Sequence, residues 1–172
     1  MAAGLPDLVD CARLAEDAVV LERVYALGDL PRVQDLLAEP GGTLHARFAF
    51  AKAPSGRAGA AVAIRAAPQL VCQRCLQGFA FPVSGGSDIE FTNDGEAAAS
   101  DAEREYFQVD GGMVSLRELA EEELLLALPV AAMCSTPQTC GHAPSLAAQA
   151  PPDASGEMRR PFSALQELLK KT

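Results

Sequence analysis

The feature that most constrains the fold is a two-residue hydrophobic period that continues on both sides of a short turn. In residues 43–50 every second residue is apolar: Leu44, Ala46, Phe48 and Phe50. After the turn Pro54-Ser55-Gly56, the same period runs through residues 57–65. Successive side chains of a β-strand point to opposite faces of its sheet. The pattern therefore predicts an antiparallel hairpin that buries one face.

Polar, basic and small residues occupy the alternate positions of this hairpin. His45, Arg47 and Arg65 are expected on the face opposite to the apolar residues. Together with Arg74 they lie in a segment, residues 42–87, that has five basic residues and no Asp or Glu. These four residues are candidates for contact with RNA, because basic side chains bind phosphates. The alternative is that each is an ordinary solvent-facing residue.

An acidic segment follows the basic one. Residues 88–123 contain twelve acidic residues and two arginines, in a chain whose net charge is −9. Such a polarised surface can contact an anionic partner with one side and repel it with the other. The candidates for binding a basic protein partner are Glu103, Glu105, Glu121 and Glu122. An ordinary solvated surface is the alternative here too.

Two helices are predicted from their end signals. Ser115 and Glu118 form a capping box for a helix over 116–128, in which Glu121 and Glu122 are expected to turn outwards. In "GDLPRVQDLLAEPGG", residues 28–42, the first Asp can cap a second helix. A Pro stands in the first turn of that segment, and Pro-Gly-Gly ends it.

The fold class predicted from all these signals is α+β. We expect a small antiparallel β-sheet or a partly open barrel core with flanking helices and a flexible C-terminal extension. Residues 1–142 would form this domain, 143–156 an Ala/Pro/Ser-rich linker, and 157–172 a short amphipathic helix or docking tail. The other expected elements are a helix at 11–17 and strands at 19–27, 68–72, 79–84, 88–91 and 105–109, with Gly85-Gly86 dividing the third strand from the fourth.

Two cysteines, Cys72 and Cys75, have the C-x-x-C spacing of a zinc knuckle. A second pair of ligands is available in Cys134 and Cys140, with His142 as an alternative fourth ligand. The five-residue gap in the second pair is wider than in common knuckles. The spacing therefore permits a zinc site, but it also fits buried or idle cysteines. A redox pair is less favoured, because Cys72 and Cys75 fall in a predicted β-turn rather than at a helix N-terminus.

The sequence has few of the features expected of an enzyme or a membrane protein. Its two histidines, His45 and His142, are far apart, and it has no Gly-x-Ser-x-Gly or phosphate-binding loop motif. No apolar run approaches the length of about 18–20 residues that a membrane span needs. We therefore expect a soluble cytoplasmic protein that is not an enzyme and has no small-molecule substrate.

Four blocks of the chain resemble a known family. They are "LVDCARLA", "VCQRCLQGFAFPV", "LRELAEEELLLALPV" and "PFSALQELLKK", and the second block is the most specific. In these blocks the chain is similar to the YceD family of large ribosomal RNA subunit accumulation proteins. In the family pattern a His and then a Cys follow the Leu-Pro, whereas this chain has Cys134 and Cys140. A His-to-Cys exchange keeps a zinc ligand.

The resemblance implies a bacterial, non-enzymatic factor in ribosome biogenesis, needed for accumulation of 23S ribosomal RNA and for large-subunit assembly. Its partner would be large-subunit RNA or a pre-ribosomal particle, contacted through the basic residues. The alternative is an acidic binding module or chaperone that holds a basic ribosomal protein.

Overall fold

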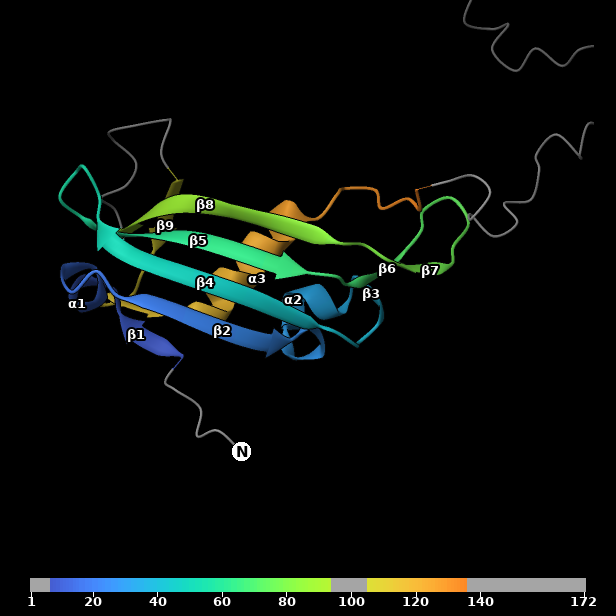
Figure 1. The fold of residues 1–172 in the computed structure, drawn as a ribbon, viewed down its shortest axis with the longest axis horizontal. Coiled ribbons are helices and arrows are strands. Elements are labelled where there is room, and N and C mark those ends of the chain that lie inside the picture. The colour runs from blue at the N-terminus through green and yellow to red at the C-terminus, as the bar shows by residue number, and fades with distance from the viewer. Residues whose placement is uncertain (1–6, 94–104, 136–172) are drawn as a thin grey trace, which may run out of the picture. The chain divides into compact units, whose positions relative to one another are not determined.

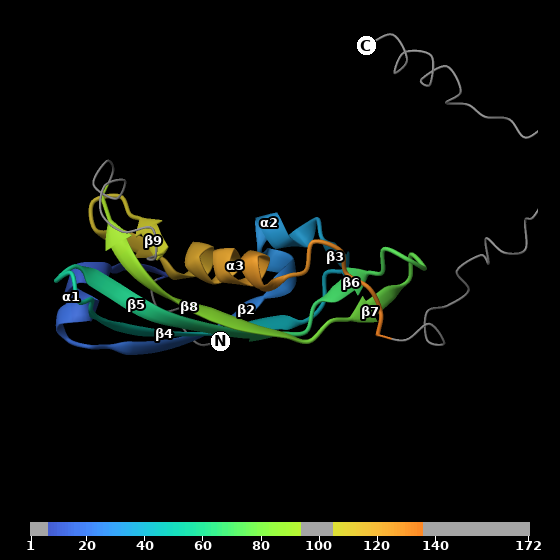
Figure 2. The same cartoon turned by 90° about the horizontal axis from the view of Figure 1, so that it is seen from above.

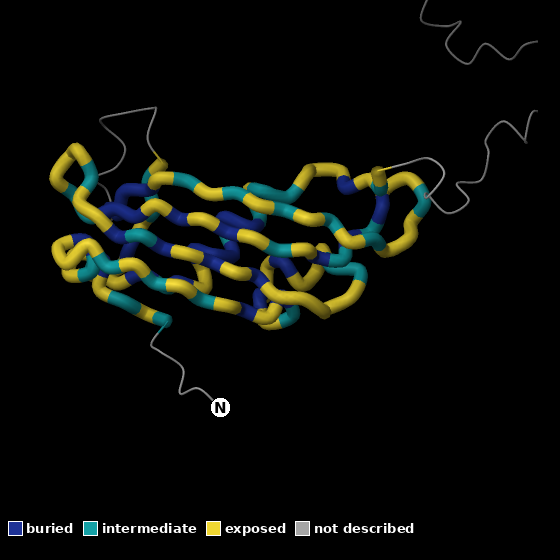
Figure 3. Tube along the Cα trace, in the orientation of Figure 1, coloured by how far each residue is buried: buried dark blue, intermediate teal, exposed yellow. Residues whose placement is uncertain are grey.

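The hairpin predicted from the alternating pattern lies at the centre of the main sheet. In the computed structural model, which describes residues 7–93 and 105–135, β4 (Thr43–Lys52) pairs antiparallel with β5 (Ala58–Ala66). Their register sets Phe48 opposite Val62 and Ala46 opposite Ile64. These four side chains are buried, while their neighbours along each strand are exposed or, at Ala49, half-buried (Figure 3). The two-residue period has therefore selected a single buried face.

Three further strands extend this sheet to the order β2-β4-β5-β8-β9. The strands β2 (Val20–Ala26) and β8 (Val83–Thr92) pair antiparallel with the hairpin, and β9 (Glu105–Gln108) pairs parallel with β8. The sheet is open, with β2 and β9 at its edges (Figure 1). The prediction of an α+β fold is confirmed. Its antiparallel core has one parallel strand that the sequence did not reveal.

Helices cover one face of the five-stranded sheet. The helix α3 (Leu116–Ala127) packs on β5 and β8, and α2 (Pro31–Gln34) lies on the same side (Figure 2). The short helix α1 (Cys11–Glu16) contacts β4 and β5. The largest fully buried side chains come from the sheet, from α3 and from the segment around α2: Phe48, Phe50, Leu44, Ile64, Leu116, Leu119, Leu124, Leu27, Leu30 and Val33. Among residues 7–93 and 105–135, no helix covers the opposite face, which is called the uncovered face from here on.

Two smaller sheets complete the fold. One has the order β3-β6-β7 and consists of β3 (Leu37–Glu39), β6 (Gln69–Val71) and β7 (Gly78–Ala80). The other is a ribbon in which β1 (Leu8–Asp10) pairs with β10 (Met113–Ser115). A 3-10 turn at Leu27–Asp29 precedes α2. The three-stranded sheet is important for the site, because the turn between β6 and β7 carries the C-x-x-C pair.

The helix predicted between Asp29 and Pro40 is shorter than expected. It spans Pro31–Gln34, and its N-cap is Leu30 rather than Asp29. Leu37 belongs to β3 instead and lies opposite Leu70 of β6. The apolar side chains that suggested one long helical stripe are thus divided between a helical turn and a strand. The hydrogen bonds of Leu37–Glu39 are made across the small sheet rather than within a helix.

The prediction that Gly85-Gly86 separates two strands is wrong. Both glycines lie inside β8, which runs without interruption beside β5. A Cβ atom on Gly86 would lie 2.2 Å from the carbonyl oxygen of Val62, and one on Gly85 would lie 3.0 Å from the Cβ of Ala127. The two glycines do not end a strand. They allow β5 and α3 to approach β8 closely.

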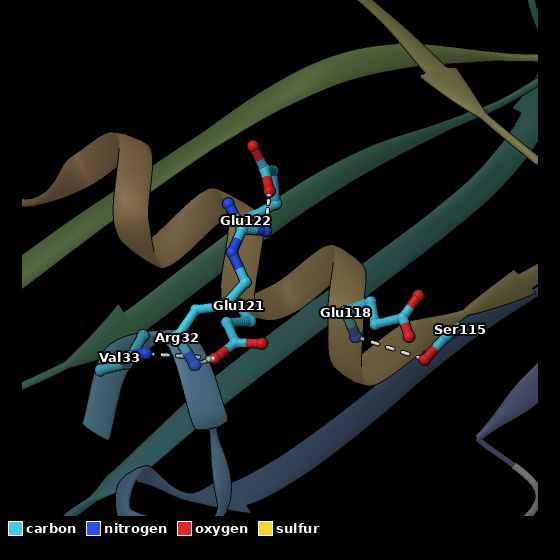
Figure 4. Close-up of polar contacts among 6 residues, drawn as sticks. All are labelled: Arg32, Val33, Ser115, Glu118, Glu121 and Glu122. Carbon is cyan, nitrogen blue, oxygen red and sulfur yellow. Dashed lines mark hydrogen bonds and ion pairs between the residues drawn. The ribbon is translucent and has the colours of Figure 1, made fainter. Parts of the chain in front are cut away.

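Glu121 was predicted to turn outwards, and the structure corrects this. Its side chain is buried, with 2% of the residue exposed. One carboxylate oxygen accepts hydrogen bonds from the backbone N–H groups of Arg32 (2.6 Å) and Val33 (3.2 Å), as Figure 4 shows. These are unpaired donors of the first turn of α2, so a side chain of α3 caps α2. The neighbouring Glu122 pairs with the Arg32 guanidinium.

The predicted linker at 143–156 and tail at 157–172 fall outside the described residues and stay predictions. In the described part of the chain no helix is long and apolar enough to span a membrane.

We predict that Glu121→Ala lowers the free energy of unfolding by about 1–3 kcal/mol, because a buried N–H group and a partly buried one lose their carboxylate acceptor. Glu121→Gln keeps an oxygen acceptor and should cost less. Urea unfolding measures both changes. The matched control is Glu118→Ala, which removes an exposed carboxylate from the same helix (Figure 4). Equal losses in Glu118→Ala and Glu121→Ala would contradict the capping role.

Candidate metal centre

The turn between β6 and β7 folds the C-x-x-C pair into a tight knuckle. The backbone N–H of Leu76 donates to the carbonyl of Cys72 (2.8 Å), and the N–H of Cys72 donates to the carbonyl of Gln77 (2.9 Å). These bonds close the chain on itself around the two cysteines. Leu76 has a φ of 60°, a left-handed conformation that is unusual for a leucine. The shape of the turn therefore includes backbone strain at Leu76.

The loop after α3 lies directly against this turn. The N–H of Gln73 donates to the carbonyl of Ala132 (2.8 Å), which joins the two segments through their backbones. The Cys134 N–H lies 3.4 Å from the sulfur of Cys72, and the two sulfur atoms lie 3.6 Å apart. The turn with Cys72 and Cys75 thus lies beside the loop that follows Pro129.

Three cysteine sulfurs form one cluster. The Sγ atoms of Cys72, Cys75 and Cys134 all lie within 4.8 Å of one another, and the three residues are buried or half-buried. Thiolates at this spacing are suitable ligands for a metal ion, and three of them leave room for a fourth ligand. The two candidates for that ligand, Cys140 and His142, fall outside the described residues.

The electrostatics of the cluster favour the thiolate form of Cys72. Its pKa is lowered to about 6, chiefly by the backbone N–H of Cys134 and then by that of Cys75, while burial opposes the shift. A thiolate, not a thiol, is the form that binds a metal. The pair also lies in a turn between two strands, whereas a thioredoxin-like pair sits at a helix N-terminus. The geometry therefore suits metal binding better than disulfide exchange.

Arg74 belongs to the cysteine cluster, not to the other basic candidates. It stands between Cys72 and Cys75 in the turn, and its Nη2 donates to the carbonyl oxygen of Cys134 over 3.2 Å. The same nitrogen lies 3.8 Å from the sulfur of Cys134. Composition alone had placed Arg74 with the arginines of the hairpin.

The other three basic candidates meet on the uncovered face of the main sheet. His45 and Arg65 lie directly opposite each other on β4 and β5, and Arg47 lies two residues further along β4. Glu22 of β2 is opposite Arg47, and their charged atoms are 4.0 Å apart. Both side chains are more than half exposed, so this ion pair is weak. The cluster is basic overall but is not free of acid.

The three acidic candidates that the structure describes differ in their surroundings. Glu121 is buried beneath α2, and Glu122 pairs with Arg32. Glu105 is exposed on the edge strand β9, and Glu103 is outside the described residues. The sequence also missed Glu123, which is buried on α3 and accepts a hydrogen bond from Ser87. Burial is the main cause that raises the pKa of the Glu123 carboxyl.

Comparison with known proteins decides the family. A family model described as large ribosomal RNA subunit accumulation protein YceD matches residues 60–169, which is well over half of the chain. The chain belongs to the YceD family. The YceD match includes the knuckle turn, the helix α3 and all three clustered cysteines. Membership gives the chain a role in the accumulation of large-subunit ribosomal RNA. No curated protein and no solved structure matches the chain.

We predict that Leu76→Gly raises the free energy of unfolding of this YceD protein by about 0.5–1 kcal/mol. Glycine adopts the left-handed conformation without the penalty of about 1–2 kcal/mol, and its own entropic cost offsets part of the gain. Leu76 is 72% exposed as a residue, so little packing is lost.

The measurement is chemical denaturation, with Gln77→Gly as the control. Gln77 is an exposed neighbour whose φ is not positive, so glycine there should destabilise the protein. The strain argument fails if Leu76→Gly destabilises it as much as Gln77→Gly does.

Proposed function

We propose that this protein promotes accumulation of 23S ribosomal RNA as a non-enzymatic assembly factor of the bacterial cytoplasm. It acts by binding large-subunit RNA or a pre-ribosomal particle through the uncovered face of its main sheet. The single observation that carries this proposal is the meeting of His45, Arg47 and Arg65 on that face. Family membership supplies the biological context.

The neighbours of these basic side chains suit contact with an RNA backbone. Ala63 lies opposite Arg47, and Gly86 and Ser84 of β8 continue the rows across the sheet. Such small side chains leave the strand surface low, so that phosphate groups can approach the arginines. No aromatic residue in the described part of the chain is exposed, so stacking on bases contributes little. The face is therefore suited to recognising RNA by shape and charge.

The test reverses the charge of Arg47 and Arg65. We predict that Arg47→Glu/Arg65→Glu abolishes cosedimentation with large-subunit precursors on a sucrose gradient. With purified large-subunit RNA, the slope of log K against log salt concentration should fall in magnitude by about 1–2, because each lost phosphate contact removes about 0.7–0.9.

The control is Arg13→Glu/Lys52→Glu, which changes the net charge equally. Arg13 is on α1, and Lys52 is at the end of β4 remote from His45. Equal effects of the two double variants would sink the proposal. If instead the reversals at Arg47 and Arg65 have no effect and neutralising Glu103, Glu105 and Glu122 is damaging, the acidic chaperone is the better model.

We also propose that the three-cysteine cluster holds a structural zinc ion, with Cys140 or His142 as the fourth ligand. Support comes from the spacing of the sulfurs, from the lowered pKa of Cys72 and from the soft character of the donors. A zinc ion would tie the loop after α3 to the small sheet, far from it in the sequence.

We predict that the purified protein contains one zinc per chain and that Cys72→Ser, Cys75→Ser and Cys134→Ser each reduce this content strongly. Elemental analysis after reducing, chelator-free purification measures it. Cys11→Ala is the matched control, because Cys11 is buried in the core and hydrogen bonds to Gly112. Comparing Cys140→Ser with His142→Ala identifies the fourth ligand. Wild-type protein without bound zinc would remove the metal site.

A further inference from the structure

We infer that Arg74 is a positioning residue of the metal centre, which compensates the charge of the thiolates and holds Cys134 in place. The inference rests on the zinc site proposed above. It removes Arg74 from the RNA-binding set, in which its charge alone had placed it.

The contacts of Arg74 connect the two halves of the centre. The residue itself is part of the knuckle turn, where its backbone N–H lies 3.5 Å from the sulfur of Cys72. Its guanidinium reaches across to the loop after α3 and donates to the carbonyl of Cys134 (3.2 Å). The same group lies 3.8 Å from the Cys134 sulfur. One residue thus contacts a ligand on each side of the junction.

The charge of a thiolate centre explains why a cation is useful there. A zinc ion with three thiolates has one net negative charge, and with four thiolates it has two. Arg74 supplies such a cation, because its guanidinium lies against the sulfur of Cys134. A guanidinium beside the sulfur of Cys134 offsets part of the excess negative charge and orients the ligand through its carbonyl.

The fork shape of the guanidinium matters as well as its charge. The planar group presents several N–H donors in fixed directions, so it can serve the carbonyl and the sulfur of one residue together. A lysine ammonium supplies the charge but lacks this geometry. The role therefore predicts that lysine restores part of the function and glutamine none of it.

The experiment compares Arg74→Gln, Arg74→Lys and Arg65→Gln in the full-length chain. Zinc affinity is measured by competition with a chromophoric chelator, and RNA affinity is measured separately with large-subunit RNA. We expect Arg74→Gln to bind zinc about 10–100-fold more weakly, the usual effect of losing an outer-shell partner. Arg74→Lys should lie between it and the wild type. Arg65→Gln should bind zinc normally and RNA weakly.

A second readout separates a role at the metal from a general loss of structure. With Co²⁺ in place of zinc, the thiolate-to-metal charge-transfer band should shift in Arg74→Gln and return towards the wild-type position in Arg74→Lys. Far-ultraviolet circular dichroism checks that the variants are folded.

Three results would overturn the inference. One is wild-type zinc affinity and an unshifted cobalt band in Arg74→Gln. Another is a loss of RNA binding in Arg74→Gln as large as that in Arg65→Gln, with zinc binding intact. The third is a wild-type protein that binds no zinc, which would remove the metal proposal itself and leave the RNA-binding proposal to its own test.

Discussion

Burial of one face of the β4–β5 hairpin determines which side chains the main sheet exposes on its other face. Phe48 and Phe50 pack into the hydrophobic core, and their strand neighbours must then face the opposite way. Arg47 is exposed because Phe48 is buried. A shift of the register by one residue would exchange the two sets, at the cost of exposing the core. The basic cluster and the hydrophobic core therefore both follow from the alternation of apolar with polar or small residues along β4 and β5.

The parts of the fold that local pattern determines were predictable. The hairpin, the Ser115 cap of α3 and the turn between β6 and β7 each depend on a signal within a few residues. The errors arose where distant chain segments meet. Leu37 joins a strand because β6 is there to pair with it, and Gly86 continues a strand because Val62 approaches closely. Neither partner is visible from the local sequence.

At the candidate site, too, residue type was predictable from the sequence, whereas the orientation of the side chains was not. Cysteine chemistry identified Cys72, Cys75 and Cys134 as possible co-ligands, although 62 positions separate Cys72 from Cys134. Charge predicted partner contacts for Arg74 and Glu121, but it did not say which way these side chains point. Arg74 faces the sulfurs, and Glu121 faces the backbone of α2. A count of charges says how many charged side chains a segment has, but not which groups they contact.

The small β3-β6-β7 sheet has its own hydrogen-bond ladder, separate from that of the five-stranded sheet. Its knuckle is bent in advance by backbone bonds and by the left-handed Leu76. Under the zinc proposal, an ion would bind to a turn that is already folded, and its loss would disturb this small sheet before the five-stranded sheet. The main sheet would then keep its structure when metal is scarce, while the order of the small sheet would depend on the metal that the cell supplies.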